Sequence, residues 1–314
     1  MVAVDETTPR YSPDRSPDFW TELARVMEDV LVRAANGDVA AIPRGIAHLP
    51  SGDGFGVMAA VDAGDGWPVV GVKVVMLPAS PRVGAPSHPG SVLLFDAKDG
   101  ALLARFDADL LTGLRTAATT ATVTRRVRPD ATSFVVIGSG TQARAHVQAL
   151  SAHYPSADFV LWGRSEQSAQ RLAHVLRADG IRVTAERDLA GALASADVVT
   201  SVTSAREPFL GARLLGPDVH VNAVGASIAG LCEWRRDVFD VAQLLLCDDT
   251  GECARQSAEV PADCLSRASD VGWLLRRGSL VPMESGVSVY KSVGVAALDV
   301  AAAKYLTDLG GNDC

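Results

Sequence analysis

The sequence predicts an α/β protein in which a doubly wound parallel sheet is joined to a smaller domain of mixed α+β structure. From about residue 131 onward, short apolar runs alternate with helical patterns, as in parallel strands joined by crossover helices. Before that point, several β-rich runs follow one another without a helix of ordinary length between them, which favours antiparallel pairing. A glycine-rich turn, G-S-G-T-Q-A, joins a strand pattern to a helix pattern at residues 138–143.

The first domain is expected to begin with a helix over residues 18–35, where apolar residues recur at helical spacing and Asn36-Gly37 ends the pattern. Clusters of Gly, Pro, Asp and Ser then separate three β-branched strand patterns, at 55–61, 69–75 and 91–95. A long helix of small residues is expected over 110–127. Another closes the chain at 295–309.

The second domain is expected to alternate between strands and helices, with helical patterns between most of the strands. The strand patterns lie at 133–137, 159–162, 198–202, 219–224 and 243–246. The helical patterns lie at 141–153, 166–179 and 188–195. The chain of 314 residues is long enough for two domains of roughly 100–200 residues each.

The turn at residues 138–143 predicts a Rossmann-type dinucleotide site. Gly138 permits a sharp turn, Gly140 lets the backbone approach a pyrophosphate, and Ala143 keeps the helix close to the strand. The anion would then bind the unpaired N–H groups at the helix start. The alternative is a strand-turn-helix corner without a ligand. We assign five residues of the turn to the cofactor site: Gly138, Ser139, Gly140, Thr141 and Gln142.

The turn after the next strand bears on the choice of cofactor. An NAD site normally carries Asp or Glu there to hold the ribose 2′-OH, whereas this chain has Arg164 and Ser165 after Trp162-Gly163. These side chains offer donors for a 2′-phosphate, although Arg164 could also be an ordinary surface arginine. We therefore expect NADPH in preference to NADH. We also assign Thr116, Thr203 and Val224 to the cofactor site.

Three isolated cations in the first domain indicate an anionic substrate. Lys73 stands in the apolar run G-V-K-V-V, where a lysine either reaches solvent at an edge or faces an anion. Arg44 lies in I-P-R-G, and Arg115 lies among small helix residues. Each alone could be structural. Together they would suit the carboxylate of an amino or imino acid.

The composition excludes several classes of partner. The formal net charge of −8 argues against a nucleic-acid groove, and no run of about 18 apolar residues predicts a membrane span. The five cysteines lack zinc spacing, so we expect reduced thiols in a cytoplasmic protein and no metal. His220, at the start of a strand pattern, could lie near the cofactor. Asp248, Asp249 and Glu252 are interpreted as a solvated loop rather than a metal site.

Several motifs, in this order, resemble the ornithine cyclodeaminase/mu-crystallin family over about residues 43–305. They are G-V-K-V-V, S-V-L-L-F-D, L-T-G-L-R-T-A-A, V-V-I-G-S-G-T-Q-A, V-N-A-V-G-A-S and K-S-V-G-V-A-A-L-D-V. The resemblance implies a homodimer. It also implies that residues 1–128 with 290–314 form a substrate-binding and dimerisation domain, and residues 129–289 an NAD(P)-binding domain. Within the first domain, Arg44, Lys73 and Arg115 match the family's substrate-carboxylate cations.

The sequence departs from the cyclodeaminase pattern at Ser227, where the resemblance leads one to expect N-A-V/I-G-A-D with a catalytic Asp. A serine cannot act as a carboxylate base at neutral pH, which favours reduction of a C=N bond over ammonia loss. Ketimine reductases similar to mu-crystallin resemble the chain here. We therefore expect NADPH-dependent reduction of an α-imino acid to an α-amino acid. Lys73 is the candidate proton donor, with Ser227 as an orienting catalytic residue.

Four other functions stay open at this point. A cyclodeaminase would release ammonia from ornithine or lysine and recycle its NAD. An alanine-type amino acid dehydrogenase would consume ammonia and a keto acid, and an opine-like synthase would join an amino acid to a keto acid. A ligand-binding protein dependent on NADPH would bind without turnover.

Overall fold

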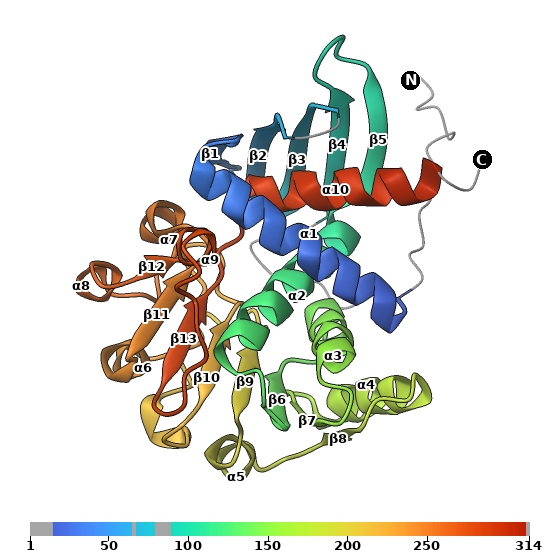
Figure 1. Ribbon diagram of the computed structural model, residues 1–314. Coiled ribbons are helices and arrows are strands. Elements are labelled where there is room, and N and C mark those ends of the chain that lie inside the picture. Colours follow the sequence, from blue (N-terminus) through green and yellow to red (C-terminus); the bar gives the residue numbers. More distant parts are fainter. Residues whose placement is uncertain (1–14, 65–66, 79–88, 312–314) are drawn as a thin grey trace. The chain divides into compact units, whose positions relative to one another are not determined.

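The chain forms two compact units in the computed structural model, which describes residues 15–64, 67–78 and 89–311 (Figure 1). One unit comprises Arg33–Arg115 with the described part of Val295–Cys314, and the other comprises Arg15–Val32 with Thr116–Gly294. The assignment of substrate and cofactor binding to the two predicted domains stays a prediction.

The first unit contains a five-stranded antiparallel sheet, which confirms the pairing predicted from the sequence. Its strands follow chain order: β1 Val39–His48, β2 Gly54–Asp62, β3 Val69–Leu77, β4 Gly90–Asp96 and β5 Leu102–Asp107. The sequence patterns did not identify β1 and β5. Both are edge strands, and β1 contains Pro43 and Gly45 at a shift in register. Proline is tolerated at such positions because no partner needs its missing N–H.

Helix α10 (Ala296–Gly311) covers one face of this sheet, as Figure 1 shows. The helix lies so close to the central strand that a Cβ at Gly71 would approach the Val300 side chain to 2.4 Å. Gly71 and Lys73 are two residues apart on β3, and such residues point to the same face of a sheet, here the face that α10 covers. The register therefore directs Lys73 toward α10.

Two long helices, α1 (Pro17–Asn36) and α2 (Ala108–Val127), are each longer than the sequence patterns indicated by one or two residues at an end. Helix α1 is amphipathic and buries Trp20, Leu23 and Met27. Helix α2 is buried along most of its length, and its small Ala and Thr residues allow close packing on every side. The Thr122 hydroxyl donates to the carbonyl of Ala24 at 2.9 Å.

The second unit contains a sheet of eight parallel strands in the order β12-β11-β13-β10-β9-β6-β7-β8. The predicted doubly wound architecture is therefore confirmed. The strands are β6 Ser133–Ile137, β7 Asp158–Trp162, β8 Val183–Ala185, β9 Val198–Ser201, β10 His220–Ala223, β11 Leu244–Cys247, β12 Ser269–Asp270 and β13 Ser288–Lys291. The sequence patterns missed β8, β12 and β13, which have only two to four residues each.

Helices connect these strands. They are α3 Thr141–His153, α4 Glu166–Ala178, α5 Leu189–Ala194, α6 Arg236–Val241, α7 Thr250–Gln256, α8 Ala262–Leu265 and α9 Val271–Arg276, with a 3₁₀ turn at Ala212–Leu214. Among the residues that can be described, no helix combines the length and apolarity needed to cross a membrane.

The strand register aligns the carboxyl ends of the central strands. Ile137 pairs with both Trp162 and Ser201, and Ala223 pairs with both Ser201 and Lys291. The loops that follow β6, β7, β9 and β10 therefore leave the same edge of the sheet. In an open α/β sheet this edge is where ligands bind.

Candidate functional site

A buried cluster of charges lies between the central strand of the antiparallel sheet and α10. The ammonium group of Lys73 donates to the Thr112 hydroxyl at 2.6 Å and to the Asp299 carboxylate at 3.2 Å. The Nε–H of Arg115 donates to the same oxygen of Asp299 at 3.0 Å. Lys73, Arg115 and Asp299 are between 1% and 4% exposed. The alternative that Lys73 reaches solvent at a sheet edge is wrong, because β3 is the central strand.

The surroundings of Lys73 favour loss of its proton. Burial lowers the pKa of Lys73 to about 8. Asp299 opposes this shift, and the positive charges of Arg115 and Arg44 reinforce it. Burial would raise the pKa of Asp299, but Arg115 and Lys73 outweigh burial and hold it below its ordinary value. Lys73 can therefore exchange a proton near neutral pH while Asp299 stays ionised.

Arg44 lies at the register shift of β1, next to Pro43. Its charge acts on Lys73, so the structure brings together the three cations predicted from the sequence. Among the described residues, the Asp299 carboxylate accepts hydrogen bonds from two of these cations, Lys73 and Arg115. Cations gathered in this way suit the carboxylate of a ligand.

Sequence reasoning missed Asp299. The signal was present, because an aspartate interrupts the apolar helix sequence A-A-L-D-V-A-A-A, and a buried carboxylate needs partners. The Oδ2 atom of Asp299 is buried without a hydrogen-bond partner among the described residues. A donor on a bound ligand could satisfy this atom.

The predicted phosphate turn has the required backbone. Gly138 adopts a φ of 138°, a conformation that side chains other than hydrogen rarely allow. A Cβ there would also lie 2.9 Å from the Val202 side chain. The space around Gly140 is open, since a Cβ at this residue would meet no atom of the described chain within 4 Å. An anion could therefore approach the backbone at Gly140.

The start of α3 has no built-in counter-charge. Gly140 occupies the N-cap, provides no side-chain cap, and is followed by no acidic residue in the first turn. The first N–H groups and the positive end of the helix dipole thus favour an external anion. Thr141 and Gln142 begin this helix, and the buried Oε1 of Gln142 has no hydrogen-bond partner in the described chain. These observations fit the pyrophosphate of a dinucleotide.

The loop after β7 adjoins this turn. A Cβ at Gly163 would lie 3.2 Å from the Ser139 hydroxyl, so the two loops are in contact. Arg164 and Ser165 are exposed there. Ser165 also caps α4, because its hydroxyl accepts from the N–H of Ser168 at 3.3 Å. The Arg164 side chain is thus available to a phosphate beside the ribose loop.

The loops after β9 and β10 carry the remaining predicted residues. The Thr203 N–H donates to the Glu233 carboxylate at 2.6 Å, and the Val224 N–H donates to the Ser201 carbonyl at 3.0 Å. Ser227 is half-buried in the turn that follows, where its N–H donates to the Gly225 carbonyl at 3.1 Å. Sequence reasoning missed Glu233, which lies between Cys232 and Trp234 just before a charged run, R-R-D.

Thr116 follows Arg115 on α2 and is 5% exposed. Its hydroxyl makes no hydrogen bond to another described residue. Within the second unit the structure thus places the loops of the four assigned strand ends along one edge of the parallel sheet. It places the three cations in the first unit.

The solvated loop expected at Asp248 is wrong, and the sequence had only left open a place for His220 near the cofactor. His220 lies at the amino end of β10, the edge opposite the phosphate turn, where its ring bonds Ser288 and Asn222 at 2.9 and 3.0 Å. Burial lowers the pKa of His220 to about 3, which keeps the ring neutral. Asp248 is buried rather than solvated. It accepts bonds from Tyr290, Ser292 and the N–H groups of residues 293 and 294, and thereby fixes the end of β13.

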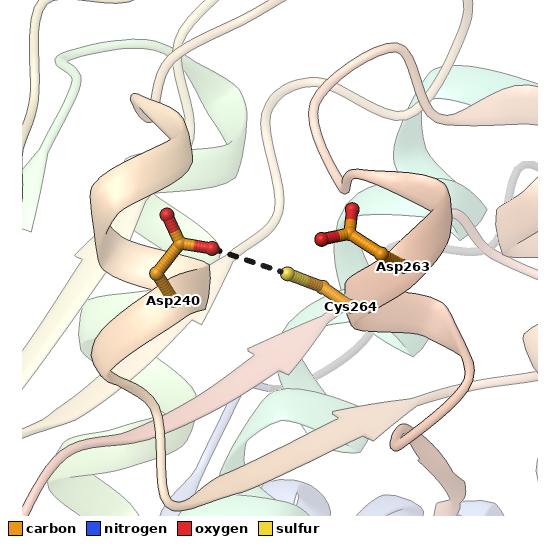
Figure 2. A group of neighbouring side chains, drawn as sticks. All are labelled: Asp240, Asp263 and Cys264. Atoms are coloured by element: carbon orange, nitrogen blue, oxygen red, sulfur yellow. Dashed lines mark hydrogen bonds between the residues drawn. The ribbon is translucent and has the colours of Figure 1, made fainter.

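One group of side chains has the spacing of a metal site. Asp240, Asp263 and Cys264 place one ligand atom each within 4.8 Å of one another, and Cys264 contacts Asp240 (Figure 2). However, the guanidinium of Arg236 forms ion pairs with both carboxylates. This cation offsets one of the two negative charges and occupies both carboxylates, and the group carries no further argument for a metal.

Comparison with known proteins assigns the chain to a family. The ornithine cyclodeaminase/mu-crystallin family matches residues 16–310, nearly the whole chain. The chain belongs to the ornithine cyclodeaminase/mu-crystallin family. The resemblance found in the sequence motifs is therefore confirmed.

Relatives in this family include reductases of C=N bonds. The ketimine reductase mu-crystallin of Mus musculus is 33% identical over 226 residues, which cover 71% of this chain and 70% of that protein. A Delta(1)-pyrroline-2-carboxylate reductase of Paracoccus denitrificans is 32% identical over 234 residues, covering 71% and 73% of the two chains. These relatives confirm the predicted class of enzyme, an oxidoreductase acting on C=N bonds.

Solved structures share the fold over almost their full length. The Delta(1)-pyrroline-2-carboxylate reductase of Thermococcus litoralis, in complex with NADH and L-proline, superposes with a TM-score of 0.85 at 22% identity, covering 94% of each chain. An archaeal alanine dehydrogenase dimer with bound NAD superposes with a TM-score of 0.81 at 23% identity, covering 93% and 92%. At these identities the likeness shows the fold.

Proposed function

We propose that the protein reduces the C=N bond of an α-imino carboxylate to an α-amino acid and consumes NADPH. The cation cluster around Lys73 carries this proposal. It combines two arginines that can bind a carboxylate with one buried ammonium whose pKa of about 8 suits proton transfer. The related ketimine and Delta(1)-pyrroline-2-carboxylate reductases support the reaction class.

Each residue of the cluster has a role in the proposal. Arg44 and Arg115 hold the substrate carboxylate, since a guanidinium can bind a carboxylate with two parallel hydrogen bonds. Lys73 donates the proton that the imine nitrogen gains, and Asp299 keeps Lys73 charged and oriented. A fixed carboxylate also limits the approach of the C=N carbon to one geometry.

The carboxyl edge of the parallel sheet would hold the cofactor. When bound, the reduced nicotinamide supplies the hydride for the C=N carbon. The amino end of α3 binds the pyrophosphate in this proposal, and Arg164 with Ser165 binds the 2′-phosphate that distinguishes NADPH from NADH. The loops that would contact the nicotinamide half of the cofactor carry Thr203, Val224 and Ser227.

The uncovered face of the antiparallel sheet supports a homodimer. On this face, Ile42, Phe55, Val61 and Leu102 are between 39% and 66% exposed, while Ser91, Arg105 and Asp107 lie on the same face at β4 and β5. The outer face of an antiparallel sheet is usually polar when it faces water. Several large apolar side chains exposed on one face indicate an interface, and we propose a second copy of the chain as its partner.

A spectrophotometric panel tests the reaction. NADPH and NADH are each supplied with five- and six-membered cyclic imino acids, and separately with pyruvate plus ammonia or amines. We expect oxidation of NADPH with at least one imino acid. If no imine supports NADPH oxidation, the proposed function is wrong. Ammonia release from ornithine without net cofactor turnover would instead identify a cyclodeaminase.

A further inference from the structure

Three buried ionisable groups lie beside the carboxyl edge of the parallel sheet and have no assigned role. Glu233, Glu259 and Lys291 are between 0% and 5% exposed. The Glu233 carboxylate accepts three hydrogen bonds, from the Thr203 N–H at 2.6 Å, the Gly225 N–H at 3.0 Å and the Ser201 hydroxyl at 2.8 Å. One side chain therefore ties together the loops that leave β9 and β10.

The direction of each bond can be assigned. Backbone N–H groups only donate, and the indole N–H of Trp234 donates to the Ser201 oxygen at 2.7 Å. The single hydroxyl hydrogen of Ser201 is then available for Glu233. All three partners of the Glu233 carboxylate are thus donors, and only a group with accepting oxygens satisfies them. An amide at this position would direct its NH₂ group at one of these donors.

Glu259 and Lys291 fix the backbone on which Glu233 is carried. One Glu259 oxygen accepts the N–H groups of both Glu233 and Trp234 at 2.7 Å each. Its other oxygen accepts from the Lys291 ammonium at 2.6 Å, and Lys291 also donates to the Ala226 carbonyl at 2.7 Å. The loop after β10 is therefore anchored at two successive residues, Gly225 and Ala226.

The two loops are also in direct contact. A Cβ at Gly225 would lie 2.2 Å from the Thr203 carbonyl oxygen and 2.6 Å from the Glu233 carboxylate. No side chain fits between them, so the spacing of Thr203 and Val224 depends on both Gly225 and Glu233. Such close backbone contact is a common reason for glycine in a loop.

The sheet topology indicates which part of a dinucleotide these loops would meet. A doubly wound sheet binds one nucleotide on each of its two halves, with the pyrophosphate at the first glycine-rich turn. The ribose loop with Arg164 follows β7, on one side of that turn. The loops after β9 and β10 lie on the other side of the turn. These loops would therefore contact the nicotinamide nucleotide.

We propose that Glu233 is a positioning residue that fixes the loops carrying Thr203, Val224 and Ser227 in the geometry that accepts the nicotinamide half of the cofactor. This inference rests on the proposed function. Charge-assisted hydrogen bonds to backbone N–H groups are stronger than neutral ones, which suits a carboxylate for holding loop backbone in place. Glu233 itself acts through the backbone.

Binding of whole and truncated cofactor tests the proposal. The affinities of the wild-type chain and Glu233→Gln are measured by calorimetry for NADPH and for 2′-phospho-ADP-ribose, which lacks the nicotinamide. We expect Glu233→Gln to lose about tenfold or more in affinity for NADPH, because it leaves a buried donor unsatisfied. Its affinity for the fragment should change by less than about twofold, since the phosphate turn is untouched.

A second variant and a control complete the test. Gly225→Ala separates the same loops without changing any charge, and should show the same selective loss if Glu233→Gln fails to fold. Glu284→Gln makes the same chemical change at an exposed residue before the amino end of β13, and should bind both ligands like the wild type.

Wild-type affinity of both loop variants for NADPH would overturn the inference. So would an equal loss for NADPH and the fragment, which indicates a general structural defect. Failure of the proposed function looks different, since the wild-type chain would then fail to bind NADPH or fail to reduce any imine.

Discussion

Replacing Asp299 by asparagine removes a negative charge that supports protonated Lys73. The Asp299 oxygen lies 3.2 Å from the Lys73 ammonium, which at an effective dielectric constant of 20 corresponds to about 5 kcal/mol of attraction. Rearrangement of the site reduces this figure, and a neighbouring opposite charge typically shifts a pKa by about 1–3 units. Because Asp299 raises the pKa of Lys73, its loss should lower that pKa from about 8 to about 6.

The pH dependence of kcat/KM reports this change. If protonated Lys73 donates to the imine nitrogen, the wild-type rate falls as the pH rises through about 8. The Asp299→Asn profile should fall through about 6. At pH 7 the protonated fraction of Lys73 then drops from about nine tenths to about one tenth, so the rate falls about tenfold from this cause alone.

The control is Asp308→Asn, which makes the same change at an exposed position of the same helix and should leave the profile unchanged. The melting temperature of each variant shows whether the fold survives. A folded Asp299→Asn enzyme whose profile still breaks at the wild-type pH would refute the role of Asp299 in holding the proton on Lys73.

Four further changes test separate parts of the proposal. Arg115→Ala should raise the KM for the imino acid at least about tenfold through the loss of a charged hydrogen bond to the carboxylate, and an unchanged KM contradicts that assignment. Arg164→Ala should raise the KM for NADPH but not for NADH, whereas equal use of the two cofactors by the wild type argues against a phosphate contact. The pKa of His220 is depressed in the folded state, so protons bind the unfolded chain first as the pH falls. Between about pH 6.5 and 3, the wild type should therefore lose up to about 1.4 kcal/mol of unfolding free energy per pH unit. His220→Gln should make this loss smaller. Ile42→Glu should convert a dimer to a monomer in light scattering, and a monomeric wild type removes the basis for the proposed interface.

The sequence predicted the main elements of the fold because their signals are local. Strands such as residues 133–137 are short β-branched runs bounded by turn residues, and the helices show apolar periodicity. The missed strands lack such signals. Edge strand β1 contains Pro43 and bulges there, and β12 has two residues whose pairing depends on a neighbour distant in sequence. Their positions follow from tertiary pairing, which periodicity does not record.

The site was predictable where a residue conflicts with its local pattern. Lys73 and Arg115 stand out as charges in apolar or small-residue runs, and the structure places both beside Asp299. The identity of the partner was not predictable, because residues 73 and 299 are joined only when α10 packs on the sheet. Asp248 was misassigned for the same reason: adjacent Asp249 is exposed, whereas Asp248 points to donors on a strand more than 40 residues away.

Lys73 and Lys291 are both buried, but the charges around them suit Lys73 to a catalytic role and Lys291 to a structural one. Lys73 lies within β3, where the sequence pattern made it stand out, whereas Lys291 ends β13, which the sequence patterns missed. Burial lowers the pKa of each. At Lys73 two arginines reinforce this shift, whereas at Lys291 the charges of Glu259 and Glu233 outweigh burial and raise the pKa.

Near neutral pH, Lys73 can therefore exchange its proton while Lys291 stays charged. A fixed charge serves as an anchor for loop backbone, and a labile proton serves for catalysis. Burial and then Glu259 raise the pKa of Glu233 to about 7, so the hydrogen bonds to Thr203 and Gly225 weaken as this carboxylate gains a proton in mild acid. Affinity for the nicotinamide half of the cofactor should consequently fall on the acid side of neutrality, where Lys73 is still fully protonated.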